Sequence, residues 1–217
     1  MLKTENFQTY GWESAIRGMR NPMNSWAKSD SGWEPQFDTA KGPVAGAFVI
    51  GPNDLDLMKR LRKGGPDDRK YLRQIFVSVD ITAPLYWWKE MDQYKVGTVT
   101  NSCSTMHKIA SKEFELKDFS CEHLASDGVG LLKKIIQYLN WNRDFFNQDK
   151  RKANWWQMIQ LLPSSYNQKR TWTANYEVLC NIYHARKNHK LDEWHTFCDA
   201  IENLPYAKEL IIGGEQE

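Results

Sequence analysis

The sequence lacks the motifs that mark the commonest enzyme classes, and it lacks the features of membrane and secreted proteins. Its 217 residues contain no phosphate-binding loop, no G-x-G-x-x-G turn, no G-x-S-x-G elbow and no H-E-x-x-H helix. No run of about 18 apolar residues occurs, and the polar N-terminus is no secretory signal, so we expect no membrane span and a cytoplasmic protein. The four cysteines form no C-x-x-C pair, which fits a reduced compartment rather than a disulfide framework.

An excess of charge of one sign is also missing. The 29 Lys and Arg nearly balance the 27 Asp and Glu, for a net charge of +2, so we expect no specific nucleic-acid partner. Aromatic residues, in contrast, reach 13% and include 10 Trp, a content that excludes a disordered chain. A chain of this length can bury a core without disulfides or metals, and we expect one domain over residues 1–217.

Hydrophobic periodicity predicts more helix than strand, and hence an α+β protein. Its clearest strand is 71–82, where Ile75, Val77 and Val79 alternate with more polar positions. A helix is expected to begin at or near Pro84. The other predicted helices are 12–19, 53–63 with Asn53 as its N-cap, 128–161 with a break, 175–189 and 191–203. Loops are expected at Asn21-Pro22 and Gly42-Pro43, and a short turn or strand at 114–119.

Two groups of reactive side chains have ordinary explanations that we prefer. Several His and Cys residues near the C-terminus could bind a metal, but their spacing matches no established zinc pattern, so we predict a polar helix surface and no metal. This group comprises Cys180, His184, His189, His195 and Cys198. The adjacent residues Cys121-Glu122-His123 rarely face one another in regular structure, and they fit a surface loop better than a catalytic pair.

Three further segments suit ligand binding as well as a structural role. Tyr86-Trp87-Trp88, followed by Tyr94-Lys95, can stack on a planar anion or can form core and interface. The polar run 101–107 can read a phosphate or a base, or it can form a turn, and its Cys103 has no identifiable base. Asn175, Asn181 and Arg186 can bind the edge of a uracil or a flavin, or can serve as a helix cap and surface residues.

These segments resemble the flavin-dependent thymidylate synthases. Leu162-Pro163, Trp172-Thr173, Asn175, Leu179, Asn181 and Arg186 follow the family's pattern without a gap, and Trp194 follows after a one-residue insertion. The stretch from Gln74 through Ala83-Pro84 to Gln93-Tyr94-Lys95 is similar to the family's strand, Ala-Pro and helix with an Arg-His-Arg motif. The run 101–107 resembles N-E-x-S-x-R-Y with one inserted residue, and 13–20 fits the family's first helix.

The resemblance implies a small sheet flanked by several long helices, the thymidylate synthase-complementing-protein-like fold. It also implies a homotetramer that binds FAD where subunits meet. The activity it implies is methylation of dUMP to dTMP, with methylenetetrahydrofolate as carbon donor and NADPH as reductant of the flavin. No cysteine nucleophile would be needed for that reaction.

Roles follow from the resemblance position by position. Arg186 would hold and polarise the pyrimidine, because a developing enolate needs a fixed cation and arginine is always charged. The other substrate-binding positions would be Glu90, Ser102 and Ser104. The cofactor-binding positions would be Gln74, Gln93, Tyr94, Lys95, Asn175 and Asn181.

The sequence also departs from the family in its charges. Gln93-Tyr94-Lys95 replaces Arg-His-Arg, Glu177 stands where a flavin-side arginine is expected, and Gln74 and Glu90 replace a histidine and a glutamine. Arginines are also replaced at Ile159 and at Thr105 or Met106. Nearby cations that can substitute for them are Lys89, Lys95, Lys108, Lys169 and Arg170. These losses keep an alternative open: a non-catalytic or substrate-divergent relative that binds a pyrimidine nucleotide, or a regulatory or structural oligomer. A third alternative is an unrelated α+β protein.

Overall fold

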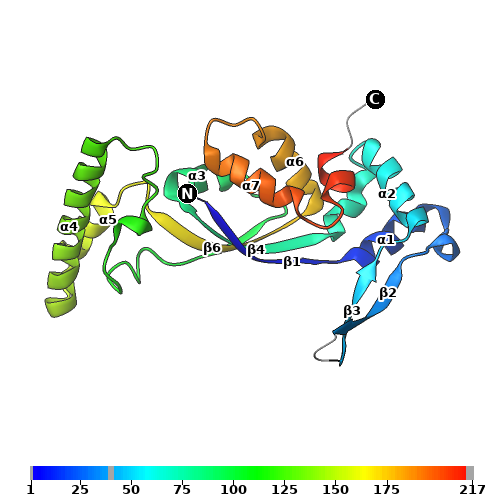
Figure 1. Ribbon diagram of the computed structural model, residues 1–217, viewed down its shortest axis with the longest axis horizontal. Helices are drawn as coiled ribbons and strands as arrows, with labels where there is room; N and C mark the ends of the chain where they lie inside the picture. Colours follow the sequence, from blue (N-terminus) through cyan, green and yellow to red (C-terminus); the bar gives the residue numbers. More distant parts are fainter. Residues whose placement is uncertain (1, 39–41, 214–217) are drawn as a thin grey trace. The chain divides into compact units, whose positions relative to one another are not determined.

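The computed structural model describes residues 2–38 and 42–213. Helix exceeds strand, as the sequence predicts (Figure 1). The strands are β1 (Lys3–Tyr10), β2 (Gly32–Asp38), β3 (Gly42–Val49), β4 (Phe76–Pro84), β5 (Val99–Ser102) and β6 (Asn167–Asn175). The α-helices are α1 (Trp12–Arg20), α2 (Pro52–Lys63), α3 (Leu85–Met91), α4 (Ser126–Asp149), α5 (Lys152–Leu161), α6 (Tyr176–Arg186) and α7 (Asp192–Glu202). Short helical turns are η1 (Asn21–Met23), η2 (Trp26–Lys28), η3 (Arg69–Gln74), η4 (Leu116–Asp118) and η5 (Lys208–Ile212).

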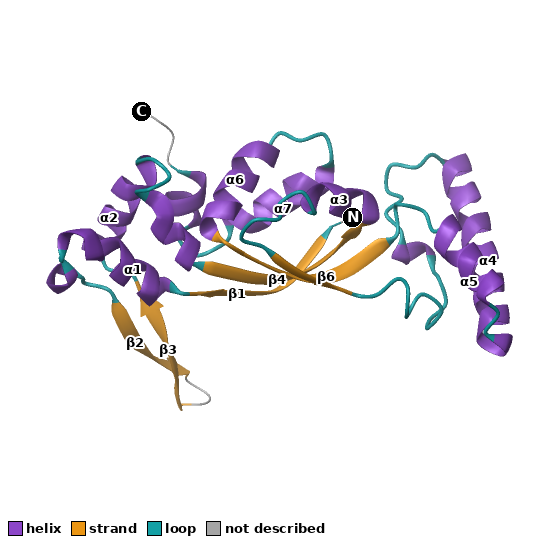
Figure 2. Ribbon diagram, turned by 180° about the vertical axis from the view of Figure 1, so that it is seen from behind, coloured by secondary structure: helices purple, strands orange, loops and turns teal. Residues whose placement is uncertain are grey.

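The strands form one small sheet and one separate hairpin (Figure 2). The sheet has four strands in the order β1-β4-β6-β5. The hairpin pairs β2 with β3 in antiparallel fashion and sets Trp33 opposite Phe48. A small sheet with several helices confirms the predicted α+β class. Within the described ranges no helix is both long and apolar enough to cross a membrane.

Packing divides the chain into two compact units. The first unit comprises residues 1–6, 79–172 and 190–197, and the second comprises 7–78, 173–189 and 198–217. A single domain over the whole chain remains a prediction.

In the second unit, helix α2 confirms the helix predicted over 53–63, but its predicted cap is wrong. Asn53 lies inside the helix, which begins at Pro52. The side chain of Asp30 caps it instead, because its two carboxylate oxygens accept hydrogen bonds from the backbone N–H of Asn53 (2.9 Å) and of Asp54 (3.0 Å). A cap from a residue more than 20 positions away leaves no local signal in the sequence.

The strand predicted over 71–82 is shorter than expected. Residues 69–74 form η3, because Tyr71 and Leu72 are both buried and consecutive strand residues would point to opposite faces. From Phe76 onward the predicted alternation is confirmed, with Val77 and Val79 buried. Gln74 therefore lies at the end of η3 and not on a strand.

Apart from β4, the strands of the described residues have no counterpart in the sequence prediction. Strand β1 consists mainly of polar residues, and β6 precedes the segment assigned to a helix. The loop expected at Gly42-Pro43 is wrong, because β3 begins at Gly42, which pairs with Asp38. Asn21-Pro22, also expected to be a loop, starts the short turn η1.

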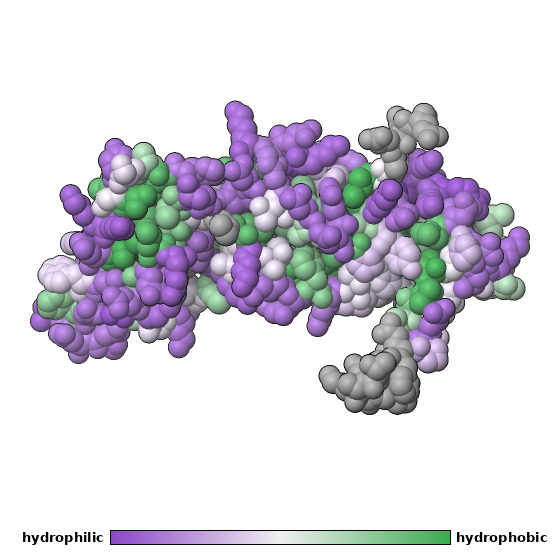
Figure 3. Space-filling model, viewed as in Figure 1, coloured by the Kyte–Doolittle hydropathy of each residue, from purple (hydrophilic) through white to green (hydrophobic). Residues whose placement is uncertain are grey.

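In the first unit, α4 and α5 confirm the long helical pattern with a break. The chain reverses at Lys150, whose φ of 59° is left-handed. The two helices share a core with the segment that contains η4. For residues 114–119 a short turn or a strand was expected, and η4 is a turn. This core comprises Ile109, Ala110, Phe114, Phe119, Leu132, Ile136, Leu139 and Met158. Tyr138, Trp141 and Phe145 remain exposed on α4, and hydrophobic atoms reach the surface over this helix pair (Figure 3).

The tryptophans that follow β4 belong to the core. Trp87 and Trp88 are buried, and the ring centroid of Trp87 lies 4.8 Å from that of Trp194 and 5.7 Å from that of Phe197. For these two tryptophans the structure shows the structural alternative, while Tyr94 of the same cluster is only half-buried.

Candidate functional site

Three side chains gather at the end of α3 in the first unit. The indole Nε1 of Trp194 donates a hydrogen bond to Oε2 of Glu90 over 3.0 Å. The ring of Tyr94 packs edge-on against Trp194, with centroids 6.2 Å apart. The indole N–H thus holds a carboxylate beside an aromatic ring, which suits binding of a planar ligand with hydrogen-bond donors. Of the predicted site residues, the structure brings Glu90 and Tyr94 together here.

Gln93 and Lys95 lie in the turn that follows α3. The backbone N–H of Gln93 donates to Glu90 O (3.1 Å), and that of Lys95 donates to Gln93 O (3.1 Å). Thr98 closes the turn, because its hydroxyl donates to Tyr94 O over 2.5 Å. The side chains of Gln93 and Lys95 are exposed. This hydrogen-bonded turn therefore presents one amide and one ammonium group to solvent.

Ser102 and Ser104 lie at the end of β5 and in the turn after it. Ser102 is exposed. The hydroxyl oxygen of Ser104 accepts hydrogen bonds from the backbone N–H of Met106 (3.2 Å) and of His107 (3.0 Å). The first two residues of the polar run 101–107 thus end β5, and the rest form a loop and turn in which the Ser104 hydroxyl can donate its proton to a ligand.

Two of the cations that could replace the family's arginines are engaged inside the first unit. Lys169 Nζ lies 3.2 Å from Asp80 Oδ2. Arg170 Nη1 donates to Asp92 Oδ1 over 2.8 Å, and its guanidinium carbon lies 4.2 Å from the Trp88 ring centroid. These contacts already balance the charges of Lys169 and Arg170.

Asp80 is the acceptor in this network. A hydrogen bond from Thr171 and others from Asn6 and Lys169 lower the pKa of Asp80 to about 2. The carboxylate therefore stays ionised at all ordinary pH values and keeps Lys169 in place.

In the second unit, α6 carries the three residues of the Asn175 pattern. Asn175 is its N-cap, because Oδ1 accepts from the backbone N–H of Val178 over 3.0 Å. Arg186 lies in the last turn and is partly exposed. Asn181 is exposed, and the helical repeat turns it well away from the face that carries Arg186. The structure therefore separates Asn181 from Arg186, and it gives Asn175 a structural role as well.

Glu177, where the resemblance expects an arginine, is bound by two arginines of η3. Arg73 donates from Nε to Oε2 and from Nη2 to Oε1, the latter over 3.2 Å. Arg69 Nε lies 3.5 Å from Oε1. The hydrogen bonds and charge of Glu177 raise the pKa of Arg73. Positive charge is thus present beside this position, but it comes from a different segment.

Gln74, next to Arg73, is held against α1. A side-chain carbon at Gly11, where φ is +91°, would come 1.9 Å from the Gln74 carbonyl oxygen. One at Gly18 would come 2.7 Å from its Oε1. Only glycines allow this close approach.

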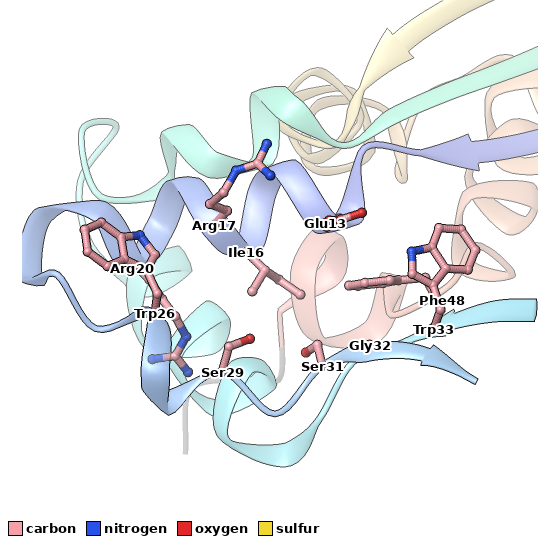
Figure 4. Close-up of a pocket in the computed structure, with 10 residues that line it drawn as sticks. All are labelled: Glu13, Ile16, Arg17, Arg20, Trp26, Ser29, Ser31, Gly32, Trp33 and Phe48. Atoms are coloured by element: carbon pink, nitrogen blue, oxygen red, sulfur yellow. The ribbon is translucent and has the colours of Figure 1, made fainter. Parts of the chain in front are cut away.

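The second unit contains a cavity that no motif in the sequence predicted (Figure 4). Its volume is about 320 Å³, within the range of small-molecule sites. It is lined by Glu13, Ile16, Arg17, Arg20, Trp26, Ser29, Ser31, Gly32, Trp33 and Phe48. The signal in the sequence was a pair of tryptophans, Trp26 and Trp33, in a segment otherwise rich in Gly, Ser and Asn.

The His and Cys residues considered for a metal have other surroundings. Nη2 of Arg62 lies 3.4 Å from His184 Nε2 and 3.8 Å from Cys180 Sγ. Burial and the nearby Arg62 lower the pKa of His184, and burial raises the pKa of Cys198 to about 11. In the part of the chain that the structure describes, no three His, Cys, Asp or Glu side chains are placed to hold a metal ion.

Comparison with known proteins places the fold. No protein-family model matches this sequence, and no curated protein matches it. Two solved structures of the flavin-dependent thymidylate synthase ThyX of Helicobacter pylori, both with FAD and dUMP, match at 15% identity with TM-scores of 0.65 and 0.64. Each match covers 97% of this chain, and they cover 97% and 96% of the respective ThyX chains.

A third solved structure is that of the UMP/dUMP methylase PolB from Streptomyces cacaoi, bound with 5-Br dUMP. It matches with a TM-score of 0.55 and 10% identity, over 93% of this chain and 88% of that one. This chain therefore has the fold of the flavin-dependent thymidylate synthases, as its sequence motifs indicated.

Proposed function

We propose that this protein methylates dUMP to dTMP as an FAD-dependent enzyme, with methylenetetrahydrofolate as carbon donor and NADPH as reductant. The observation that supports this most is a fold shared over 97% of both chains with an enzyme whose structure contains FAD and dUMP. The motif residues retained on this fold, Asn175 and Arg186, add to it. A single domain, a homotetramer and a cytoplasmic location belong to the same proposal.

Arg186 is the residue to which we assign the electrostatic role. Its guanidinium is charged at every working pH and sits in the last turn of α6, partly shielded from water. A fixed cation stabilises negative charge that develops on a pyrimidine carbonyl oxygen, and it does so best where water is partly excluded. Glu90, held by Trp194, is suited to accept a hydrogen bond from a pyrimidine N–H.

The donor set fits a flavin in its chemistry. Asn175 uses Oδ1 as a cap, so its Nδ2 group would donate to a flavin carbonyl. Tyr94 offers a ring for stacking, and Gln74, Gln93 and Lys95 offer amide and ammonium groups. Asn181 is assigned to the cofactor by the resemblance alone. A bound FAD, once reduced, would supply the electrons for the methyl group. The resemblance also implies that no cysteine nucleophile is required.

The second candidate is a relative that binds a pyrimidine nucleotide without turnover, or that acts on another one. Two observations favour it: Gln93-Tyr94-Lys95 in place of Arg-His-Arg, and the pairing of Lys169 and Arg170 with carboxylates. Each lost charge-assisted contact to a phosphate costs about 1.5–3 kcal/mol of binding free energy.

The visible absorbance spectrum of the purified protein, before and after addition of FAD and then dUMP, tests the proposal. We expect a flavin band that dUMP perturbs, followed by dUMP-dependent oxidation of NADPH and formation of dTMP. Flavin and dUMP binding without turnover would support the second candidate. No flavin retained at excess FAD would overturn FAD dependence.

A further inference from the structure

The cavity in the second unit lies between α1 and the segment that leads into the hairpin β2–β3. Glu13, Ile16 and Arg20 are spaced three or four residues apart, so they share the face of α1 that looks into it. Ser29 and Ser31 lie opposite (Figure 4). Trp33 and Phe48 close one end, and Trp26 lies toward the other. The cavity is thus an elongated slot with aromatic rings toward both ends.

These aromatic rings are exposed although they are well oriented. Trp33 is 66% exposed and Trp26 is 50% exposed. The ring of Trp33 meets Phe48 edge-on at 5.5 Å, and Nε1 of Trp26 donates to Asn21 Oδ1 over 2.8 Å. Exposed but fixed indoles offer flat apolar surface to a ligand at a low entropic cost.

Most polar groups on the floor of the cavity are already paired. Ser29 and Ser31 both donate from their hydroxyls to Asp54 Oδ2 over 2.7 Å. Arg20, only 4% exposed, donates from Nε to Asp54 Oδ1 over 2.6 Å and from Nη1 to Ser25 O over 3.3 Å. Its third nitrogen, Nη2, has no partner among residues 2–38 and 42–213.

The carboxylate of Glu13 is a second uncommitted group on the lining, which also includes the guanidinium of Arg17. The carboxylate extends toward the end formed by Trp33 and Phe48 (Figure 4). It has no hydrogen bond or ion pair to any residue whose position is described. Glu13 and Arg20 are seven residues apart, two helical turns or about 10 Å along α1. One end of the slot thus offers an acceptor beside aromatic rings, and the other offers the Nη2 donor of Arg20, a residue only 4% exposed as a whole.

We propose that this cavity binds a flat heterocycle with a 2-amino-4-oxo edge, as found in guanine nucleotides and in pterins. Such an edge presents two adjacent N–H donors, which match the two oxygens of the Glu13 carboxylate. The ring stacks on Trp33, and the attached group runs over Ile16 so that one of its oxygens accepts from Arg20 Nη2. The guanine alternative is independent of the proposed function, whereas the pterin alternative rests on it, because the carbon donor methylenetetrahydrofolate is itself a pterin.

Calorimetric titration of the full chain with GMP, IMP and folate tests it. IMP is GMP without the 2-amino group. We expect GMP or folate to bind with a Kd below about 1 mM and IMP to bind about tenfold more weakly or worse, because one charge-assisted hydrogen bond is lost. Preference for GMP identifies a guanine site, and preference for folate identifies a pterin site.

Two variants locate the binding. Glu13→Gln should weaken the tighter ligand about tenfold and remove the discrimination between GMP and IMP. The matched control is Glu34→Gln, which changes a carboxylate beside Trp33 that does not line the cavity. Circular dichroism verifies that both variants fold. Equal binding of GMP and IMP, unchanged affinity in Glu13→Gln, or no binding of GMP or folate would each overturn the proposal.

Discussion

Arg73, at the end of η3, binds Glu177, in the first turn of α6, through two hydrogen bonds. Position 177 is where the family resemblance expects an arginine on the flavin side. Through this ion pair the guanidinium of Arg73 lies beside position 177, although residue 177 itself carries a carboxylate. Arg73 is the exposed member, with 53% of its side chain accessible, and so it is the one available to a ligand.

A charge exchange tests this relationship. We expect Arg73→Glu to weaken FAD binding several-fold, because it places two carboxylates side by side where the cofactor's anionic groups need a cation. The double variant R73E/E177R should recover most of the affinity, since it restores both the pair and an arginine at 177. FAD titration followed by flavin fluorescence measures both. A double variant no better than Arg73→Glu would show that Arg73 does not substitute for the missing arginine.

Arg186 is expected to determine nucleotide affinity. Arg186→Ala should weaken dUMP binding about 10- to 100-fold, the effect of one charge-assisted contact, while the fold is kept. The measurement is dUMP titration of the FAD-loaded protein, with circular dichroism as the check on folding. Lys187→Ala, at the neighbouring exposed position, is the control. Unchanged dUMP affinity in Arg186→Ala would remove Arg186 from the site.

The replaced Arg-His-Arg motif predicts a gain of binding. Gln93 is exposed in the turn after α3, and its Nε2 makes one hydrogen bond, to Lys89 O over 3.2 Å. Gln93→Arg should therefore be tolerated and should tighten FAD binding about tenfold by adding a cation for the cofactor phosphates. Gln93→Met is the neutral control in the same titration. If Gln93→Arg leaves the affinity unchanged, this turn does not contact the cofactor.

The buried pair of Arg20 and Asp54 predicts how stability depends on pH. Burial by itself would raise the pKa of Asp54, but donors from Ser29, Ser31 and Arg20 outweigh it and hold the pKa below its usual 3.8. Because the folded pKa is the lower one, the contribution of Asp54 to stability is complete above about pH 4 and is lost as the pH falls through the folded pKa.

Asp54→Asn should lower the free energy of unfolding at neutral pH by about 3–5 kcal/mol, because Arg20 keeps a buried charge without its partner. It should also flatten the loss of stability between neutral and acidic pH. Urea unfolding at several pH values measures both effects. Asp56→Asn, in an exposed pair with Arg60, is the control and should change little. An unchanged acid dependence in Asp54→Asn would assign that dependence to other carboxylates.

Much of the fold was readable from local pattern. Helix α2, the pair α4 and α5 with its break, and the alternation of β4 all follow from apolar residues at a fixed period. The faces so defined are buried in part: Met58, Leu132 and Val77 are buried, whereas Leu131 is exposed. The motif from Trp172 to Arg186 likewise indicated the fold, because its spacing is continuous in sequence. These features depend on residues close along the chain, and for that reason a single sequence contains them.

Other features were decided only by tertiary structure. The mainly polar β1 and the unassigned β6 become strands by pairing in the sheet, and Asp30 caps α2 from another segment. Lys169 also pairs with Asp80, and Glu177 with Arg73, although the members of each pair are far apart in sequence. The fold likewise brings Glu13 to the same cavity as Trp33. Hydrogen bonds and ion pairs act over a few ångströms in space, so no local period records which residues will meet.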